Sequence, residues 1–128
     1  MGTPGSSFRR RLLIESLTVL AADARTQTAW LDRHGVAADE IALDFDHAFR
    51  TAEVLVADGR IADGAVADLR EIDAILSGMS GGENADRWTR AALATDAGWV
   101  RARRLARRVL VAEQGEWRQP LPEITVVR

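Results

Sequence analysis

The chain has 128 residues, of which 47% are hydrophobic and 28% charged, and its formal net charge is −2. This length and composition are typical of one globular domain that buries its own core, and not of a disordered chain. Cysteine is absent, which excludes disulfides, a thiol nucleophile and a cysteine-ligated zinc site. Every cation is an arginine, so mechanisms that need a lysine, such as a Schiff base or a P-loop, are excluded as well.

Helical periodicity dominates the sequence, and turn residues divide it into segments. Residues 1–6 are expected to be a disordered lead-in. Ser7 can cap the first helix and Gly35 can end it, while Gly81 and Gly82 predict a loop at 79–84. The predicted helices are, in chain order, 7–34, 39–58, 63–77, a short segment around Trp88, Ala91 and Ala92, and 96–115.

These elements predict an all-α fold, an antiparallel helical bundle of four main helices plus one short helical segment, over residues 7–115. Pro120 and Pro122 prevent a helix in residues 116–128, which we expect to form an extended or flexible tail. No apolar run approaches the ~20 residues that a membrane span needs. The arginines near the start precede an interrupted apolar run, so we expect no export signal and a cytoplasmic location.

The charges are sorted along the chain. Residues 39–73 contain ten carboxylates against three arginines, a net charge of −7. Residues 87–108 contain seven arginines against Asp96 alone, a net charge of +6. Such a field can steer and orient a binding partner, although it does not determine a fold.

Few residues could carry out catalysis. Glu40, Asp44 and His47 lie at helical spacing that could hold a metal, but no second helix supplies a matching carboxylate–histidine pair. A solvated polar face with Asp44–His47 pairing is the interpretation we favour. No catalytic triad or glycine-rich phosphate loop is present, so we expect a protein that is not an enzyme and needs no cofactor or metal.

The arginine row of the last predicted helix allows two interpretations. Arg101, Arg104 and Arg108 share its outer side and could dock on a phosphate backbone. The same arginines could instead pair with the acids of the two central helices inside the molecule. Since the chain is acidic overall, nucleic-acid binding is the alternative and not the preferred function.

The helix predicted over 39–58 carries an outward stripe opposite its core face. The stripe consists of Leu43, His47, Arg50 and Val54. Asp46 and Glu53 lie on one flank of it, and Asp44 and Glu40 lie on the other. An apolar pair surrounded by carboxylates is a common composition for a protein-binding patch. The other possibility is that a neighbouring helix of the bundle covers Leu43 and Val54.

Three parts of the chain resemble colicin-D-type immunity proteins, which are small helical bundles encoded beside bacterial tRNase toxins. They are LDFDHAF at 43–49, LREIDAIL at 69–76, and Trp88-Thr89 followed by the segment 99–110. The resemblance spans residues 41–110. It implies a non-catalytic inhibitor that covers a basic nuclease active site with an acidic helical surface.

On that resemblance we expect a protein partner, a basic toxin domain. Carboxylates can mimic the phosphates that a nuclease binds and can raise the association rate. Leu43 and Val54 would form the apolar centre of the interface. The expected electrostatic contacts are Asp44, Asp46, Glu53, Asp68, Glu71 and Asp73.

Overall fold

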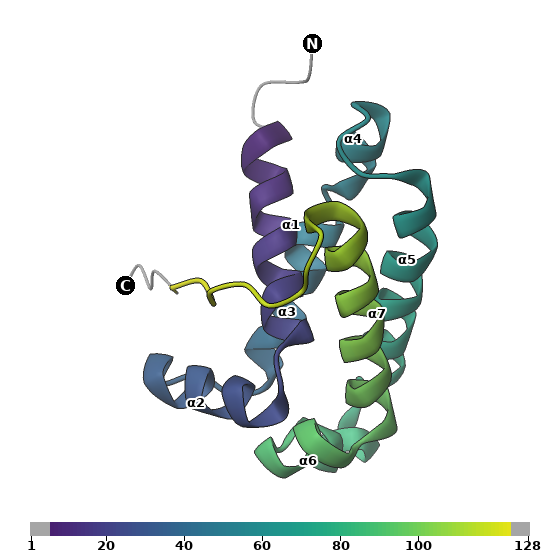
Figure 1. The fold of residues 1–128 in the computed structure, drawn as a ribbon. Coiled ribbons are helices and arrows are strands. Elements are labelled where there is room, and N and C mark those ends of the chain that lie inside the picture. Colours follow the sequence, from purple (N-terminus) through teal and green to yellow (C-terminus); the bar gives the residue numbers. More distant parts are fainter. Residues whose placement is uncertain (1–5, 124–128) are drawn as a thin grey trace.

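The computed structural model describes residues 6–123, and every regular element in that range is helical (Figure 1). The all-α prediction is therefore confirmed for the described residues, although they form eight helical segments where five were expected. The segments are α1 (Ser6–Ala21), α2 (Ala24–His34), α3 (Asp39–Phe49), α4 (Ala52–Ala57), α5 (Asp63–Gly78), the 3-10 helix η1 (Gly82–Trp88), α6 (Arg90–Thr95) and α7 (Ala97–Gln114).

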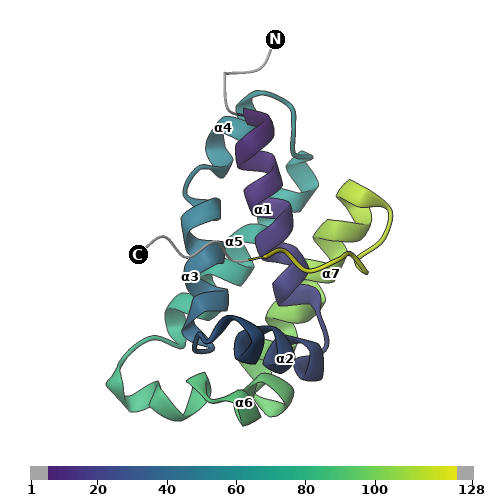
Figure 2. The same ribbon diagram turned by 90° about the vertical axis from the view of Figure 1, so that its left-hand side faces the viewer.

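Helix α7 organises the packing. It contacts α5 and α1, and α1 in turn packs against α3 and α4. Helices α2 and α6 pack together at one end of the molecule (Figures 1 and 2). Contacts between α3 and α5 are fewer, so one side of the helical assembly is less closed.

The largest fully buried side chains include Leu13, Leu17, Phe45, Leu55, Leu69, Ile72 and Trp99. In the described part of the chain, no helix combines the length and apolar character that crossing a bilayer requires.

The predicted helix 7–34 is wrong in one respect, because the chain leaves the helix at Ala22 and Asp23. Asp23 has extended backbone angles, φ −59° and ψ 151°. The end of a helix leaves its last carbonyls without intrahelical partners. Here side chains from other segments bind those carbonyls, so a break forms where neither glycine nor proline marks one.

Three side chains bind this helix end, and we call them the α1 clamp: Gln27, Arg103 and Arg107. Gln27 is fully buried and donates from Nε2 to the carbonyls of Val19 and Leu20, at 3.0 and 3.1 Å. Arg107 donates from Nε to the Ala21 carbonyl at 2.8 Å. Hydrogen bonds from a charged donor are stronger than neutral ones, and a cation at a helix C-terminus also interacts favourably with the helix dipole.

Arg103 connects three segments through the clamp. Its Nε donates to the Ala22 carbonyl at 3.0 Å, and its Nη2 donates to Gln27 Oε1 at 3.0 Å and to the Leu93 carbonyl at 2.7 Å. Partial burial lowers the pKa of this guanidinium, and the charge of Arg107 adds to the effect. An arginine nevertheless keeps its proton at ordinary pH, so the clamp stays cationic.

The predicted helix 39–58 is also divided, into α3 and α4. The Thr51 hydroxyl donates to the Ala48 carbonyl at 2.9 Å, and the Thr51 amide donates to the same carbonyl at 3.2 Å. A threonine that bonds back to the preceding turn competes with helical hydrogen bonding. The sequence reading missed this local competition.

Other predicted boundaries agree with the structure. Helix α5 matches the predicted 63–77 to within a residue, and α7 begins after Asp96, whose Oδ1 accepts from the Gly98 amide at 2.8 Å. Gly115, with φ 84°, ends α7 as expected.

The loop predicted at 79–84 is corrected in its second half, where η1 begins. The short predicted segment is likewise split, with Trp88 in η1 and the two alanines in α6.

The predicted tail has no helix over its described part, residues 116–123. It crosses α1 and reaches α2, where the Trp30 indole donates to the Pro122 carbonyl at 2.8 Å (Figure 1). Trp117 packs under the Arg107 guanidinium, 3.8 Å from the ring centroid. The rest of the predicted tail, 124–128, and residues 1–5 of the predicted lead-in lie outside the described residues, and α1 already begins at Ser6.

Replacing Arg103 by methionine is expected to lower the free energy of unfolding by about 2–3 kcal/mol, because the carbonyls of Ala22 and Leu93 lose a charged donor. Urea unfolding followed by circular dichroism measures the change. Arg104→Met on the exposed side of the same helix is the matched control, with an expected change within about 0.5 kcal/mol. Equal losses in the two variants would contradict the role of the clamp.

Candidate functional site

A groove between α3, α5 and η1 contains four of the predicted site residues. They are Leu43, Asp46, Arg50 and Asp73. The groove encloses about 620 Å³, and Asp39, Leu76, Ser77, Ser80, Ala85 and Trp88 complete most of its walls. We call it the acidic groove. Leu43 is 61% exposed there, so no helix of the described part covers it, and the apolar stripe is free at this position.

The charges of the acidic groove are only partly compensated. Arg50 binds Asp46 through two parallel hydrogen bonds, Nε to Oδ2 at 3.1 Å and Nη2 to Oδ1 at 2.8 Å. The side chains of Asp39 and Asp73 make no hydrogen bond or ion pair within the described part of the chain. Two free carboxylates therefore flank an exposed leucine, an arrangement that favours a cationic ligand.

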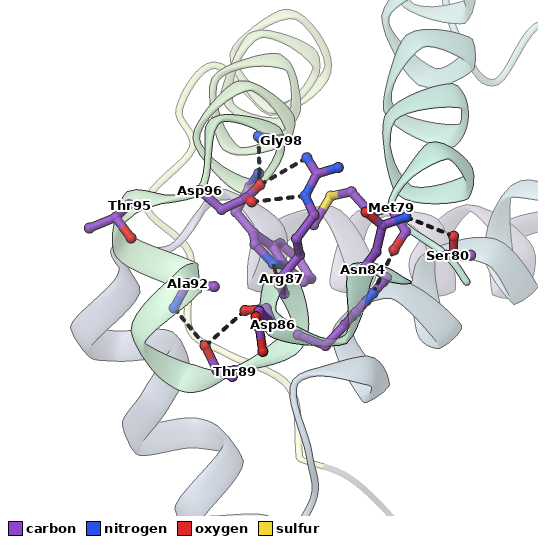
Figure 3. A network of polar contacts seen from close by, with 12 residues as sticks. Met79, Ser80, Asn84, Asp86, Arg87, Thr89, Ala92, Thr95, Asp96 and Gly98 are labelled. Atoms are coloured by element: carbon purple, nitrogen blue, oxygen red, sulfur yellow. Dashed lines mark hydrogen bonds and ion pairs between the residues drawn. The ribbon is translucent and has the colours of Figure 1, made fainter. Parts of the chain in front are cut away.

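The η1 wall of the groove is held in place by an ion pair. Arg87 binds Asp96 by Nε–Oδ2 and Nη2–Oδ1 contacts of 2.9 and 3.2 Å (Figure 3). This guanidinium holds the pKa of Asp96 below its usual range, and hydrogen bonds from the Gly98 and Trp99 amides lower it further. Asp96 thus caps α7 and fixes η1 at once.

Two tryptophans complete this attachment. The Trp99 indole donates to the Arg87 carbonyl at 2.7 Å, and the Trp88 indole donates to the Met79 carbonyl at 2.8 Å. Their rings meet edge to face with centroids 5.4 Å apart. A Cβ atom at Gly98 would lie 2.6 Å from Met79 Sδ and 2.9 Å from Arg87 Nη2, so a larger residue there would displace both side chains. Trp88 is therefore presented to the groove from a rigid support.

Asp44 and His47 lie on the opposite edge of α3 and do not share the groove. They line a smaller cavity of about 270 Å³ between α1, α3 and the tail, together with Glu15, Glu40 and Glu123. Burial and the neighbouring Glu40, through its charge and a hydrogen bond, raise the pKa of Asp44 to about 7. Within residues 6–123, no group of three or more histidine or acidic side chains is arranged to hold a metal.

The remaining predicted acids are distributed differently. Asp68 pairs with Arg108 at 3.3 Å, and Glu71 pairs with Arg101 at 2.5 Å. This is the internal pairing that the sequence analysis left open, so both carboxylates face α7 and not the groove. Val54 on α4 is half-buried and lines neither cavity. Glu53 also belongs to α4, but its side chain lies outside the described part.

The arginines of α7 are mostly engaged. Arg103 and Arg107 belong to the α1 clamp, and Arg101 and Arg108 bind acids of α5. Of the five arginines on this helix, Arg104 alone has no hydrogen bond or ion pair with the described residues. The continuous basic row suggested by the sequence is therefore reduced to one free cation.

Sequence reasoning missed two parts of the groove. Asp39 entered the prediction only as the first residue of the helix 39–58, whereas its side chain makes no capping hydrogen bond and lines the groove. Trp88 was assigned to a helix, whereas it ends η1 and faces the groove. A possible signal was the tryptophan directly after a glycine-rich loop, since an indole beside a turn is often half-buried with its N–H bound.

Comparison of the chain with protein-family models, with curated proteins and with solved structures gave no significant match. The resemblance to colicin-D-type immunity proteins consequently rests on the sequence pattern alone. The function has to be argued from the groove itself.

Asp44 predicts a measurable pH dependence of stability. Its pKa is higher in the folded chain than the ordinary 3.8, so the folded state binds more protons and stability falls as pH rises toward about 7. Asp44→Asn stays neutral, so its melting temperature is expected to exceed that of the unmodified chain by a few degrees at about pH 8 and by less at about pH 5.

Thermal melts across this pH range test the expectation. The exposed Asp86 supplies a matched control, because Asp86→Asn is expected to shift the melting temperature equally at both pH values. A difference between Asp44→Asn and the unmodified chain that does not grow with pH would contradict the assignment.

Proposed function

We propose that this chain is a non-catalytic protein-binding module, an immunity-type inhibitor that holds a basic toxin domain in its acidic groove. The observation that carries the proposal is the grouping of two uncompensated carboxylates, Asp39 and Asp73, around the exposed Leu43. A cationic surface gains from those carboxylates, while an apolar side chain of the partner gains from covering Leu43.

The groove geometry narrows the interface expected from the sequence. Leu43, Asp46, Arg50 and Asp73 are retained as partner contacts, and Asp39 and Trp88 are added. Asp68 and Glu71 already have arginine partners, so a toxin would have to compete with α7 for them. Asp44 and His47 lie across α3 from the groove and would meet a partner only if it wrapped around that helix.

Such a groove suits a nuclease inhibitor for an electrostatic reason. Nuclease active sites are lined with cations that bind phosphates, and carboxylates held on a rigid wall can occupy the same positions. Complementary charge chiefly raises the association rate, whereas the covered apolar centre slows dissociation. We therefore expect the carboxylates of the groove to raise the association rate of the partner, and Leu43 to lower its dissociation rate.

The scaffold of this function is, in our proposal, the expected antiparallel bundle. Helices α1, α5 and α7, with α3 and α4 as one interrupted helix, would be its four main members, acting in the cytoplasm. The side between α3 and α5 is the less closed one, and the groove lies there. No observation favours the alternative of nucleic-acid binding, because four of the five α7 arginines already have partners.

The test is capture of a basic protein from a lysate of the host by the immobilised chain, followed by binding kinetics with the captured domain. Asp73→Lys is expected to weaken binding roughly tenfold or more, mainly through a slower association that depends less on salt. Leu43→Ala is expected to act mainly on the dissociation rate.

Glu116→Lys is the matched control, since it makes the same charge change on the exposed tail away from the groove. It is expected to leave the kinetics almost unchanged. If Asp73→Lys and Glu116→Lys bind the captured domain alike, the groove is not the interface.

A further inference from the structure

A second cavity lies beside the acidic groove, between the α3–α4 junction and α5. It encloses about 700 Å³ and is lined mainly by apolar side chains: Phe49, Ala52, Val56, Val66 and Leu69. Arg50 and Arg70 line it as well, and none of the lining residues that the structure describes is a carboxylate. Its described lining is thus opposite in character to that of the acidic groove, and of its lining residues the proposed function uses Arg50 alone.

Several apolar side chains that line this cavity belong to the buried core or pack against it. Leu69 and Ala52 belong to the buried core, with 0% and 4% of their surface exposed. Phe49 stacks on the buried Phe45, with ring centroids 5.5 Å apart and planes 11° apart. The interruption before α4 helps to create the space, because α4 packs on α1 and leaves the side toward α5 open.

The charge at this cavity is also unbalanced. Arg50 is neutralised by its two hydrogen bonds to Asp46. Arg70 is exposed and makes no hydrogen bond or ion pair within the described residues. A single unpaired guanidinium therefore borders an apolar cavity whose volume is in the range of small-molecule sites.

We propose that this cavity binds a linear aliphatic carboxylate, such as a medium-chain fatty acid. The hydrocarbon chain lies against Phe49, Val56 and Val66, which are half-buried and gain from being covered. The carboxylate binds Arg70, whose planar fork matches its two oxygens. A ligand with a zwitterionic or cationic head group would lose the ion pair with Arg70. A fully polar anion would leave the apolar side chains of the cavity exposed to water.

The probe is monomeric decanoate, titrated into the isotopically labelled full-length chain and followed by amide chemical shifts. We expect saturable one-to-one binding, with the shifts concentrated at Phe49, Val56, Val66 and Arg70. Arg70→Gln is expected to weaken decanoate binding roughly tenfold or more, because it removes a charged hydrogen-bonding partner. Arg104→Gln is the matched control and is expected to leave binding unchanged, because Arg104 on α7 is also exposed and has no partner among the described residues.

A second pair of measurements separates the two parts of the ligand. Decanol, which has the chain without the charge, is expected to bind the unmodified protein more weakly than decanoate and to be insensitive to Arg70→Gln. Ala57→Glu places a carboxylate at the exposed edge of the cavity and is expected to abolish binding of decanoate, while circular dichroism checks that the variant folds.

Three results would each overturn the proposal. They are absence of saturable binding, equal weakening by Arg70→Gln and Arg104→Gln, and equal affinity for decanol and decanoate. Attachment to phosphatidylglycerol vesicles without binding of monomeric decanoate would also overturn it and would identify a membrane surface instead. Because every measurement uses the isolated chain, the outcome is independent of whether a toxin occupies the acidic groove.

Discussion

The structure depends on a set of hydrogen bonds between the end of α1 and side chains of α2 and α7. By binding the carbonyls of Val19, Leu20, Ala21 and Ala22, the α1 clamp lets the chain leave the helix at an apolar stretch without exposing unpaired acceptors. The chain then turns into α2, and α3 returns along α1. The edge of α3 that faces α5 lines both the acidic groove and the apolar cavity beside it.

Charge pairing determines which part of the acidic segment remains for a partner. The pairs of α7 with Asp68 and Glu71 are largely solvent-exposed on the arginine side, and such pairs add little stability. Their larger effect is to remove two acids and two arginines from the electrostatic surface. Among the charges that stay unpaired in the described part of the chain, Asp39 and Asp73 line one cavity and Arg70 lines the next.

Local sequence signals predicted local features well. The predicted bounds of the last helix, 96–115, and of α5 follow from residues within a turn of each boundary, and the structure agrees. The break after α1 could not be predicted, because its partner Arg103 lies 81 residues from Ala22. The candidate site was likewise predicted only in part. Helical spacing placed Leu43 and Arg50 on one surface, as the structure does, but it assigned Asp44 to that surface too. The helical period gives the side of α3 on which a residue lies, but it does not show which other helix packs beside that residue.

The tryptophans of this chain are placed where segments join. The indole N–H groups of Trp30, Trp88 and Trp99 each donate to a backbone carbonyl of another segment, and Trp117 rests against Arg107. Tryptophan fluorescence depends on these contacts between segments, whereas far-ultraviolet ellipticity depends on the helices themselves. If η1 or the tail detaches from the rest of the molecule, the fluorescence therefore changes while the helical ellipticity stays the same.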